Sequence, residues 1–66
     1  MKAPLIEIEA VREIADRELS PYDGRERTGT IFQMGRAFLA FDLTDTHVTT
    51  APTMRDAVQA LRRAPA

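Results

Sequence analysis

The sequence predicts a small α+β domain in the order α-β-β-β-α, with two helices packed on one face of a short antiparallel sheet. Its length of 66 residues suffices for one domain. Near both ends the apolar residues recur at a helical spacing, and between them they alternate with a period of two. Two helical ends around an alternating centre, joined by short connections, are typical of an α+β fold.

The first predicted element is a helix over residues 5–19. An apolar stripe covers about a third of its circumference, as in an amphipathic helix. The residues of this stripe are Leu5, Ile8, Val11, Ala15 and Leu19. Ser20 would end the helix, because a residue that precedes a proline avoids α geometry. A strand over residues 5–10 is the alternative, since the apolar residues also alternate there, but the continuation of the stripe to Leu19 favours the helix.

The middle of the sequence predicts a hairpin of two strands over residues 27–34 and 37–43. Threonines and aromatic residues, which favour strands, recur at every second position, and Gly35-Arg36 suits a two-residue turn. This register gathers the large apolar side chains on one face. The predicted cross-strand pairs are Met34–Ala37, Phe32–Leu39, Thr30–Phe41 and Thr28–Leu43.

A third strand is expected over residues 47–50, after a turn at residues 44–46, and a helix over residues 53–63. Thr53 followed by Asp56 resembles a capping box at the start of that helix. Met54, Val58 and Leu61 have the spacing of a buried helical stripe.

The composition excludes several classes of protein. There are nine Lys and Arg against ten Asp and Glu, so the net charge is −1, and there is no cysteine. A disulfide framework and a thiolate zinc site are therefore excluded. No apolar run approaches the ~20 residues of a membrane span, and Glu7 interrupts the first apolar stretch too early for a signal peptide. We expect a soluble, cytoplasmic protein without membrane contact.

Catalytic or metal-binding residues are sparse in the sequence. His47 is the single histidine, and with Asp42 and Asp45 it could form a weak metal or acid–base site. A hydrated turn beside an exposed histidine explains the same residues, because metal ligands need a converging and supported arrangement. We therefore expect no enzyme and no cofactor, and a small metal-dependent enzyme is the third hypothesis.

A protein-binding surface is the leading functional hypothesis. Residues 37–41 are apolar on both faces of the predicted strand, and two short helices on one face would leave the other uncovered. The uncovered face would carry Ile31, Phe38 and Ala40 at its centre. Gln33, Arg36 and Asp42 would form a polar rim around them. The sequence thus predicts a non-enzymatic regulator or inhibitor that acts by protein–protein contact and can form a homodimer. A phage or mobile-element inhibitor of a host machine, of the anti-CRISPR type, fits this hypothesis.

Two other surfaces are possible. The first predicted helix is acidic, and Glu9, Glu13 and Asp16 could bind a basic partner. A nucleic-acid-binding accessory protein is the second functional hypothesis, although a net charge near zero argues against it. That protein would use the arginines Arg25, Arg27, Arg36, Arg62 and Arg63.

Overall fold

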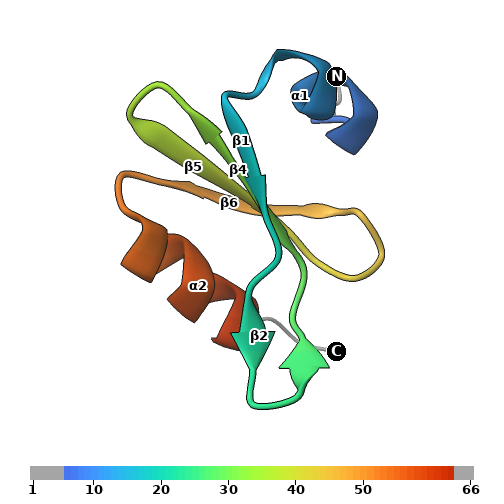
Figure 1. The fold of residues 1–66 in the computed structure, drawn as a ribbon, viewed down its shortest axis with the longest axis vertical. Coiled ribbons are helices and arrows are strands. Elements are labelled where there is room, and N and C mark those ends of the chain that lie inside the picture. Colours follow the sequence, from blue (N-terminus) through green and yellow to red (C-terminus); the bar gives the residue numbers. More distant parts are fainter. Residues whose placement is uncertain (1–5, 64–66) are drawn as a thin grey trace, which may run out of the picture.

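A computed structural model describes residues 6–63 of the chain. It shows an α+β domain with two helices, a four-stranded antiparallel sheet and a separate two-stranded hairpin, which confirms the predicted fold class (Figure 1). The elements are α1 (Ile8–Ile14), β1 (Arg17–Leu19), β2 (Tyr22–Asp23), β3 (Glu26–Arg27), β4 (Thr30–Met34), β5 (Ala37–Phe41), β6 (His47–Ala51) and α2 (Met54–Arg63). None of the helices in this part of the chain is both long and apolar enough to span a membrane.

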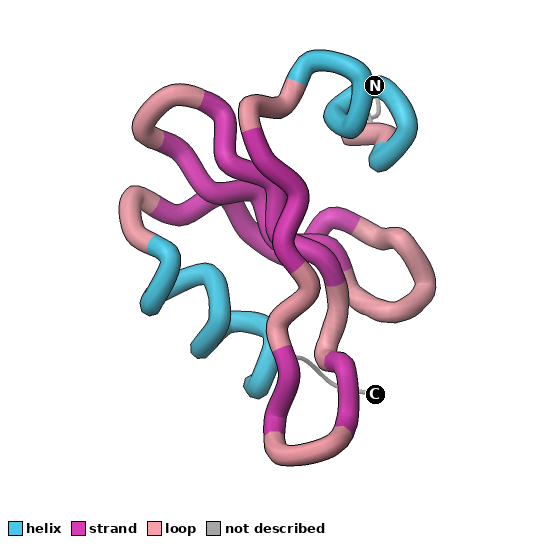
Figure 2. The backbone as a smooth tube through the Cα atoms, viewed as in Figure 1, coloured by secondary structure: helices cyan, strands magenta, loops and turns pink. Residues whose placement is uncertain are grey.

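The large sheet has the strand order β1-β4-β5-β6, and each strand is antiparallel to its neighbour (Figure 2). Its centre is the predicted hairpin, in which Gly35 adopts a left-handed φ of 59° at the start of the two-residue turn. The predicted register is confirmed from Met34–Ala37 to Thr30–Phe41. The predicted Thr28–Leu43 pair does not form, because the Thr28 amide donates instead to the Pro21 carbonyl at 3.0 Å.

Leu5, where both predictions for this segment begin, lies outside the described residues. Within them, the predicted helix over residues 5–19 is wrong before Ile8 and beyond Ile14, and the alternative strand over residues 5–10 is wrong as well, since the chain is helical from Ile8. At Ala15 the backbone conformation changes from helical to extended, with a ψ angle of 147°. The Asp16 amide donates to the Gln33 carbonyl at 2.8 Å, and β1 then pairs with β4. The hydrogen bonds offered by the free edge of β4 thus override a local helical pattern.

The two helices cover opposite faces of the sheet, so the prediction that both pack on one face is wrong. Alternate residues of β4 and β5 point to opposite faces, and both sets are apolar, so each face requires a cover. Helix α1 packs Ile8 and Val11 on one face; the sheet residues beneath it are Phe32, Leu39 and Phe41. Helix α2 packs Ala57 and Leu61 on the other face; the sheet residues there are Ile31, Ala40 and Ala51.

The C-terminal half follows the prediction closely. Strand β6 extends one residue beyond the predicted end, and α2 begins one residue after the predicted start. The Thr53 hydroxyl accepts the Asp56 amide at 3.1 Å, as the capping pattern predicts. The pairing of β5 with β6 shifts between Ala40–Thr49 and Phe41–His47, which makes Val48 the extra residue of a β-bulge.

Gly29, directly before β4, lies against the end of β5 and the side chain of Leu61 in α2. A Cβ atom at this position would overlap the Phe41 carbonyl oxygen and would lie 3.2 Å from the side chain of Leu61. The close approach of β5 and α2 at this point therefore requires a glycine.

Candidate protein-binding surface

The predicted sheet-face patch does not lie open to solvent. Ile31 and Ala40 are completely buried beneath α2, so they cannot be the centre of an exposed interface. Gln33 and Phe38 are half-buried at the margin of the helix, and Arg36 is exposed. This cover was not predicted, because both helices were expected on the same face of the sheet.

The accessible remainder of the patch belongs to a row of residues that crosses the sheet. Arg17 of β1 pairs with Gln33 of β4, which pairs with Phe38 of β5, which pairs with Ala51 of β6. Phe38 and Ala51 belong to the apolar cluster beneath α2, so side chains of this row lie on the α2 face. Cross-strand pairing thus places an exposed arginine beside a half-buried glutamine, with a half-buried phenylalanine on the next strand.

Two further arginines border this row. Arg36 lies in the β4–β5 turn, two residues before Phe38, and Arg55 follows Met54, whose side chain packs on the same cluster as Phe38. We call the set of Gln33, Phe38, Arg17, Arg36 and Arg55 the arginine-rimmed surface. Arg17 and Arg55 were not predicted as site residues. Arg17 and Glu18 are both charged, so no local alternation of polar and apolar residues marks β1 as a strand.

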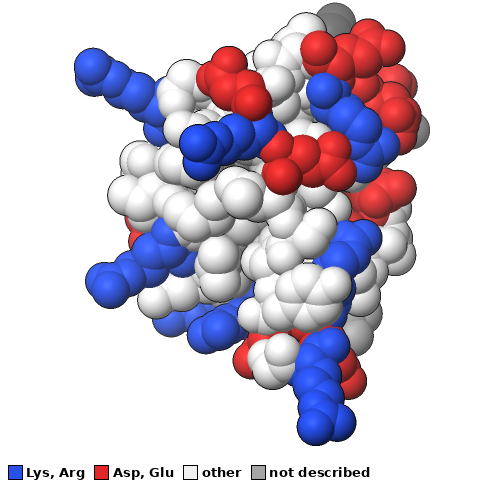
Figure 3. All heavy atoms as spheres, viewed as in Figure 1, with Lys and Arg blue, Asp and Glu red and all other residues white. Residues whose placement is uncertain are grey.

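The arginines of this surface have positive charge available for a ligand. Within residues 6–63 the ion pairs involve Arg12 and Arg62, and none involves Arg17, Arg36 or Arg55. The nearby Asp16 carboxylate accepts the Gly35 amide at 2.9 Å and so holds the β4–β5 turn. In Figure 3 the acidic side chains gather at the α1 end, whereas the surface over β1 and α2 is largely uncharged and bordered by basic side chains. Such a surface combines an apolar contact with guanidinium groups suited to carboxylates.

The alternative acidic surface is divided by the fold. Glu9 forms an ion pair with Arg12 at 2.6 Å, and Asp16 lies beyond the end of α1 with its carboxylate on the Gly35 amide. Glu13 is exposed on α1. Two of the three predicted carboxylates thus have intramolecular partners.

The five arginines proposed for nucleic acid do not form one surface either. Arg25 and Arg27 lie in the β2–β3 hairpin, and Arg62 reaches Asp23 of that hairpin at 4.0 Å from the end of α2. Arg36 lies in the β4–β5 turn, at the other end of the domain (Figure 1). The Arg27 guanidinium donates to the Gly29 carbonyl at 2.8 Å and to the Thr30 hydroxyl at 3.1 Å, so it supports the loop.

The predicted metal or acid–base site is not assembled. Asp42 turns its carboxylate to the loop that follows it: Oδ1 accepts the Thr44 hydroxyl at 2.6 Å and the amides of Thr44 and Thr46. The Thr44 hydroxyl, followed by the Thr46 amide, lowers the pKa of Asp42. His47 instead contacts the Thr50 hydroxyl at 2.9 Å, with its ring 5.5 Å from that of Phe41. Among the residues that the structure describes, no three His, Asp or Glu side chains are grouped to hold a metal ion.

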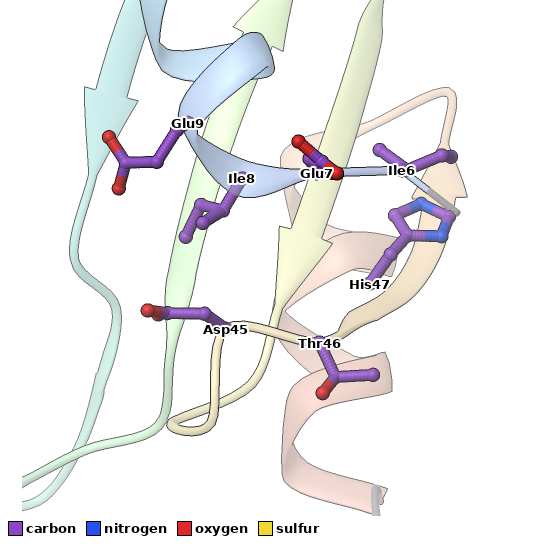
Figure 4. Close-up of a pocket in the computed structure, with 7 residues that line it drawn as sticks. All are labelled: Ile6, Glu7, Ile8, Glu9, Asp45, Thr46 and His47. Carbon is purple, nitrogen blue, oxygen red and sulfur yellow. The ribbon is translucent and has the colours of Figure 1, made fainter. Parts of the chain in front are cut away.

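An open groove of about 570 Å³ separates the start of α1 from the loop before β6 (Figure 4). The side chains of Ile6 and His47 lie next to each other on one side, and the acidic side chains of Glu9 and Asp45 lie toward the other. Its full lining is Ile6, Glu7, Ile8, Glu9, Asp45, Thr46 and His47. This groove was not predicted, because the two segments that line it, residues 6–9 and 45–47, are almost forty residues apart in the chain.

Comparisons with protein-family models, with curated proteins and with solved structures find no match. The candidate site of this chain is therefore defined by its own geometry: the arginine-rimmed surface joins the accessible part of the predicted interface, Gln33, Arg36 and Phe38, to Arg17 and Arg55.

Proposed function

We propose that this chain is a non-enzymatic regulator or inhibitor that binds an acidic segment of a partner protein on the arginine-rimmed surface. The observation that carries the proposal is the cross-strand row in which exposed Arg17 lies beside half-buried Gln33, which in turn lies beside half-buried Phe38. Arginine and aromatic residues supply most of the binding energy in many protein interfaces. An apolar centre within a polar rim is the usual anatomy of such an interface.

The charges favour a carboxylate-bearing protein segment over a nucleic acid. Arg17 belongs to the short cross-strand row, and Arg36 and Arg55 are exposed within four residues of its members Phe38 and Ala51 in the chain. Each guanidinium can bind a carboxylate through two parallel hydrogen bonds. A long polyanion would also meet the acidic α1 end, and the net charge of −1 gives it no general attraction. A short acidic segment with one apolar side chain matches both features of the surface.

The test is a charge reversal at Arg17, the first residue of the row, and at Arg55 of α2. A photo-crosslinking residue at Gln33 captures the partner in the producing cells, and the purified partner is then titrated by calorimetry. We expect Arg17→Glu with Arg55→Glu to weaken binding at least about 10-fold, because reversed charges oppose the carboxylates. The matched control is Arg25→Glu with Arg63→Glu, which makes the same charge change on exposed residues elsewhere and should leave binding within about 2-fold.

Two results would overturn this proposal. Equal weakening by both pairs of substitutions would mean that net charge, and not this surface, governs binding. A captured ligand that is degraded by nuclease, and whose gel shift decreases steeply with salt, would establish the nucleic-acid hypothesis instead. Circular dichroism of each variant verifies that the folded state is retained.

A further inference from the structure

The outer edge of β6 is open in the part of the chain that the structure describes. Strand β6 pairs with β5 on one side, and no strand within residues 6–63 pairs with its other side. In an antiparallel strand, every second residue directs its N–H and C=O groups away from the neighbouring strand. Alternate residues among the five of β6 therefore present backbone groups to which another strand can add.

The two edges of the sheet differ in how they are protected. The β1 edge has three residues, and both Arg17 and Glu18 on it are charged; Glu18 is further held by Arg12 at 3.1 Å. Strand β6 has the sequence His-Val-Thr-Thr-Ala, with no lysine, arginine or acidic residue and with β-branched residues at its centre. The bulge at Val48 is the protective feature of this edge, and the pairing from Thr49 to Ala51 is regular.

We propose that a second copy of this chain binds antiparallel along the outer edge of β6, so that the two sheets form one continuous sheet. With a two-fold axis at Thr49, His47 faces Ala51 of the second copy and Val48 faces its Thr50. No pair in this register brings like charges together, and the threonines and Val48 form β-branched cross-strand contacts. The strand is therefore complementary to itself, as a two-fold interface requires.

A second copy suits this edge better than an unrelated strand. The edge carries neither a formal charge nor a large side chain that would select a particular foreign sequence, whereas its own sequence fits it in register. A domain of 66 residues also buries a small share of its surface, so association supplies burial that one chain lacks. This inference goes beyond the proposed function, because the arginine-rimmed surface consists of residues of β1, β4, β5, the β4–β5 turn and α2, and none of them belongs to β6.

The first test introduces one charge at the edge. Thr50 is exposed, so Thr50→Lys should preserve the monomer fold and place a lysine in the strand pair of each copy. By sedimentation velocity, we expect the parent to show a monomer–dimer equilibrium, and Thr50→Lys to raise the dissociation constant at least about 10-fold. The control is Gln59→Lys, the same charge change on the exposed side of α2, which should leave that constant within about 2-fold.

The second test uses the absence of cysteine from the chain. Thr49→Cys should form an intermolecular disulfide rapidly on mild oxidation, because the axis brings the two residues face to face. Glu13→Cys, exposed on α1, is the control and should cross-link much more slowly. Cross-linking at equal rates would contradict the proposed pairing.

A parent protein that remains monomeric up to about 1 mM would also contradict it. A dimer with the same dissociation constant in Thr50→Lys would do so too. Loss of partner capture in Thr50→Lys, with a monomeric parent, would instead assign the edge to a strand of a different protein. Failure here is separable from failure of the proposed function, because Arg17→Glu with Arg55→Glu leaves β6 unchanged.

Discussion

On the α2 face, the helix meets the sheet through alanine and aliphatic side chains, and Ala40 and Ala57 are completely buried at the contact. The small residues let α2 lie close to β5 and β6. On the α1 face, two phenylalanine rings fill the space: Phe32 and Phe41 meet edge to face, with centroids 5.6 Å apart. Helix α1 has seven residues against ten in α2, so large side chains in the sheet compensate for a shorter cover.

The α1 face also uses charged side chains as part of its cover. The Arg12 guanidinium lies 5.7 Å from the centroid of the Phe32 ring and forms ion pairs with Glu9 at 2.6 Å and Glu18 at 3.1 Å. Glu18 belongs to β1, so this group ties α1 to the edge of the sheet. The two faces show two ways to cover a sheet. One uses apolar side chains of a helix, and the other uses aromatic rings of the sheet beneath a network of charged side chains.

The strongest test of the aromatic face is Phe41→Ala. Phe41 is completely buried and contacts Phe32, so removing the ring should lower the free energy of unfolding by about 3–5 kcal/mol. A loss of this size is comparable with the whole stability of a small domain. Urea denaturation measures it, with Leu43→Ala at an exposed position as the control. An unchanged midpoint for Phe41→Ala would mean that this face does not depend on its rings.

The corresponding test beside the α2 face is Gly29→Ala. The new Cβ would overlap the Phe41 carbonyl oxygen and press on Leu61, so we expect a loss of about 2–4 kcal/mol in the free energy of unfolding. Gly24→Ala is the control, because Gly24 has a left-handed φ of 68° but open space around it, and should cost about 1–2 kcal/mol. Equal losses would show that backbone strain alone, and not close packing, acts at Gly29.

Arg12→Met separates the charged network from the apolar contacts of the α1 face. The variant keeps a long side chain over Phe32 but loses both ion pairs, so its melting temperature should fall by less than that of either variant above. Salt at about 1 M should reduce the difference between parent and variant, because it screens exposed charges. Arg63→Met, at the exposed end of α2, is the control. A difference that persists in salt would contradict an electrostatic role.

The smallest effect concerns Asp42, in the loop beside the α1 face. The Thr44 hydroxyl and the Thr46 and Thr44 amides hold the pKa of Asp42 below its ordinary value of 3.8 in the folded chain. A carboxyl group with a lowered folded-state pKa contributes stability above the unfolded pKa and loses it as the pH falls through the folded value.

Asp42→Asn should therefore melt with a weaker pH dependence than the parent between about pH 5 and pH 2. Thermal melts across this range measure the difference, with Asp45→Asn in the same loop as the control. An identical acid response in Asp42→Asn and the parent would contradict the role of this carboxylate.

The β4–β5 hairpin and α2 were predictable because their signals are local. Alternation over residues 28–34, a glycine at the turn and the spacing of Met54, Val58 and Leu61 each act within a few residues of the chain. The register of the β4–β5 hairpin was also predictable, because a shift by one residue would move the phenylalanines to the other face of the sheet.

The N-terminal region and the site were not predictable in the same way. Leu19 completes a helical stripe in the sequence, yet in the structure it packs beneath α2. The reason is that β1 forms backbone hydrogen bonds with the edge of β4, a strand that begins eleven residues after Leu19. Arg17 reaches the candidate site through the same long-range pairing. Likewise, the two helices pack on opposite faces because β5 carries apolar side chains on both of its faces. The helical periodicity of a segment does not indicate which of these faces the helix covers.

Strand β5 has β4 and β6 beside it and both helices across its faces, so its amides can exchange with deuterium only when the domain opens as a whole. Strand β1 is held at one edge by three paired residues, and α1 joins it through Ala15 and Asp16. The two can detach from β4 together while α2 stays packed on the opposite face. Within residues 6–63 we therefore expect slow hydrogen exchange in β4, β5, β6 and α2, and faster exchange in α1 and β1.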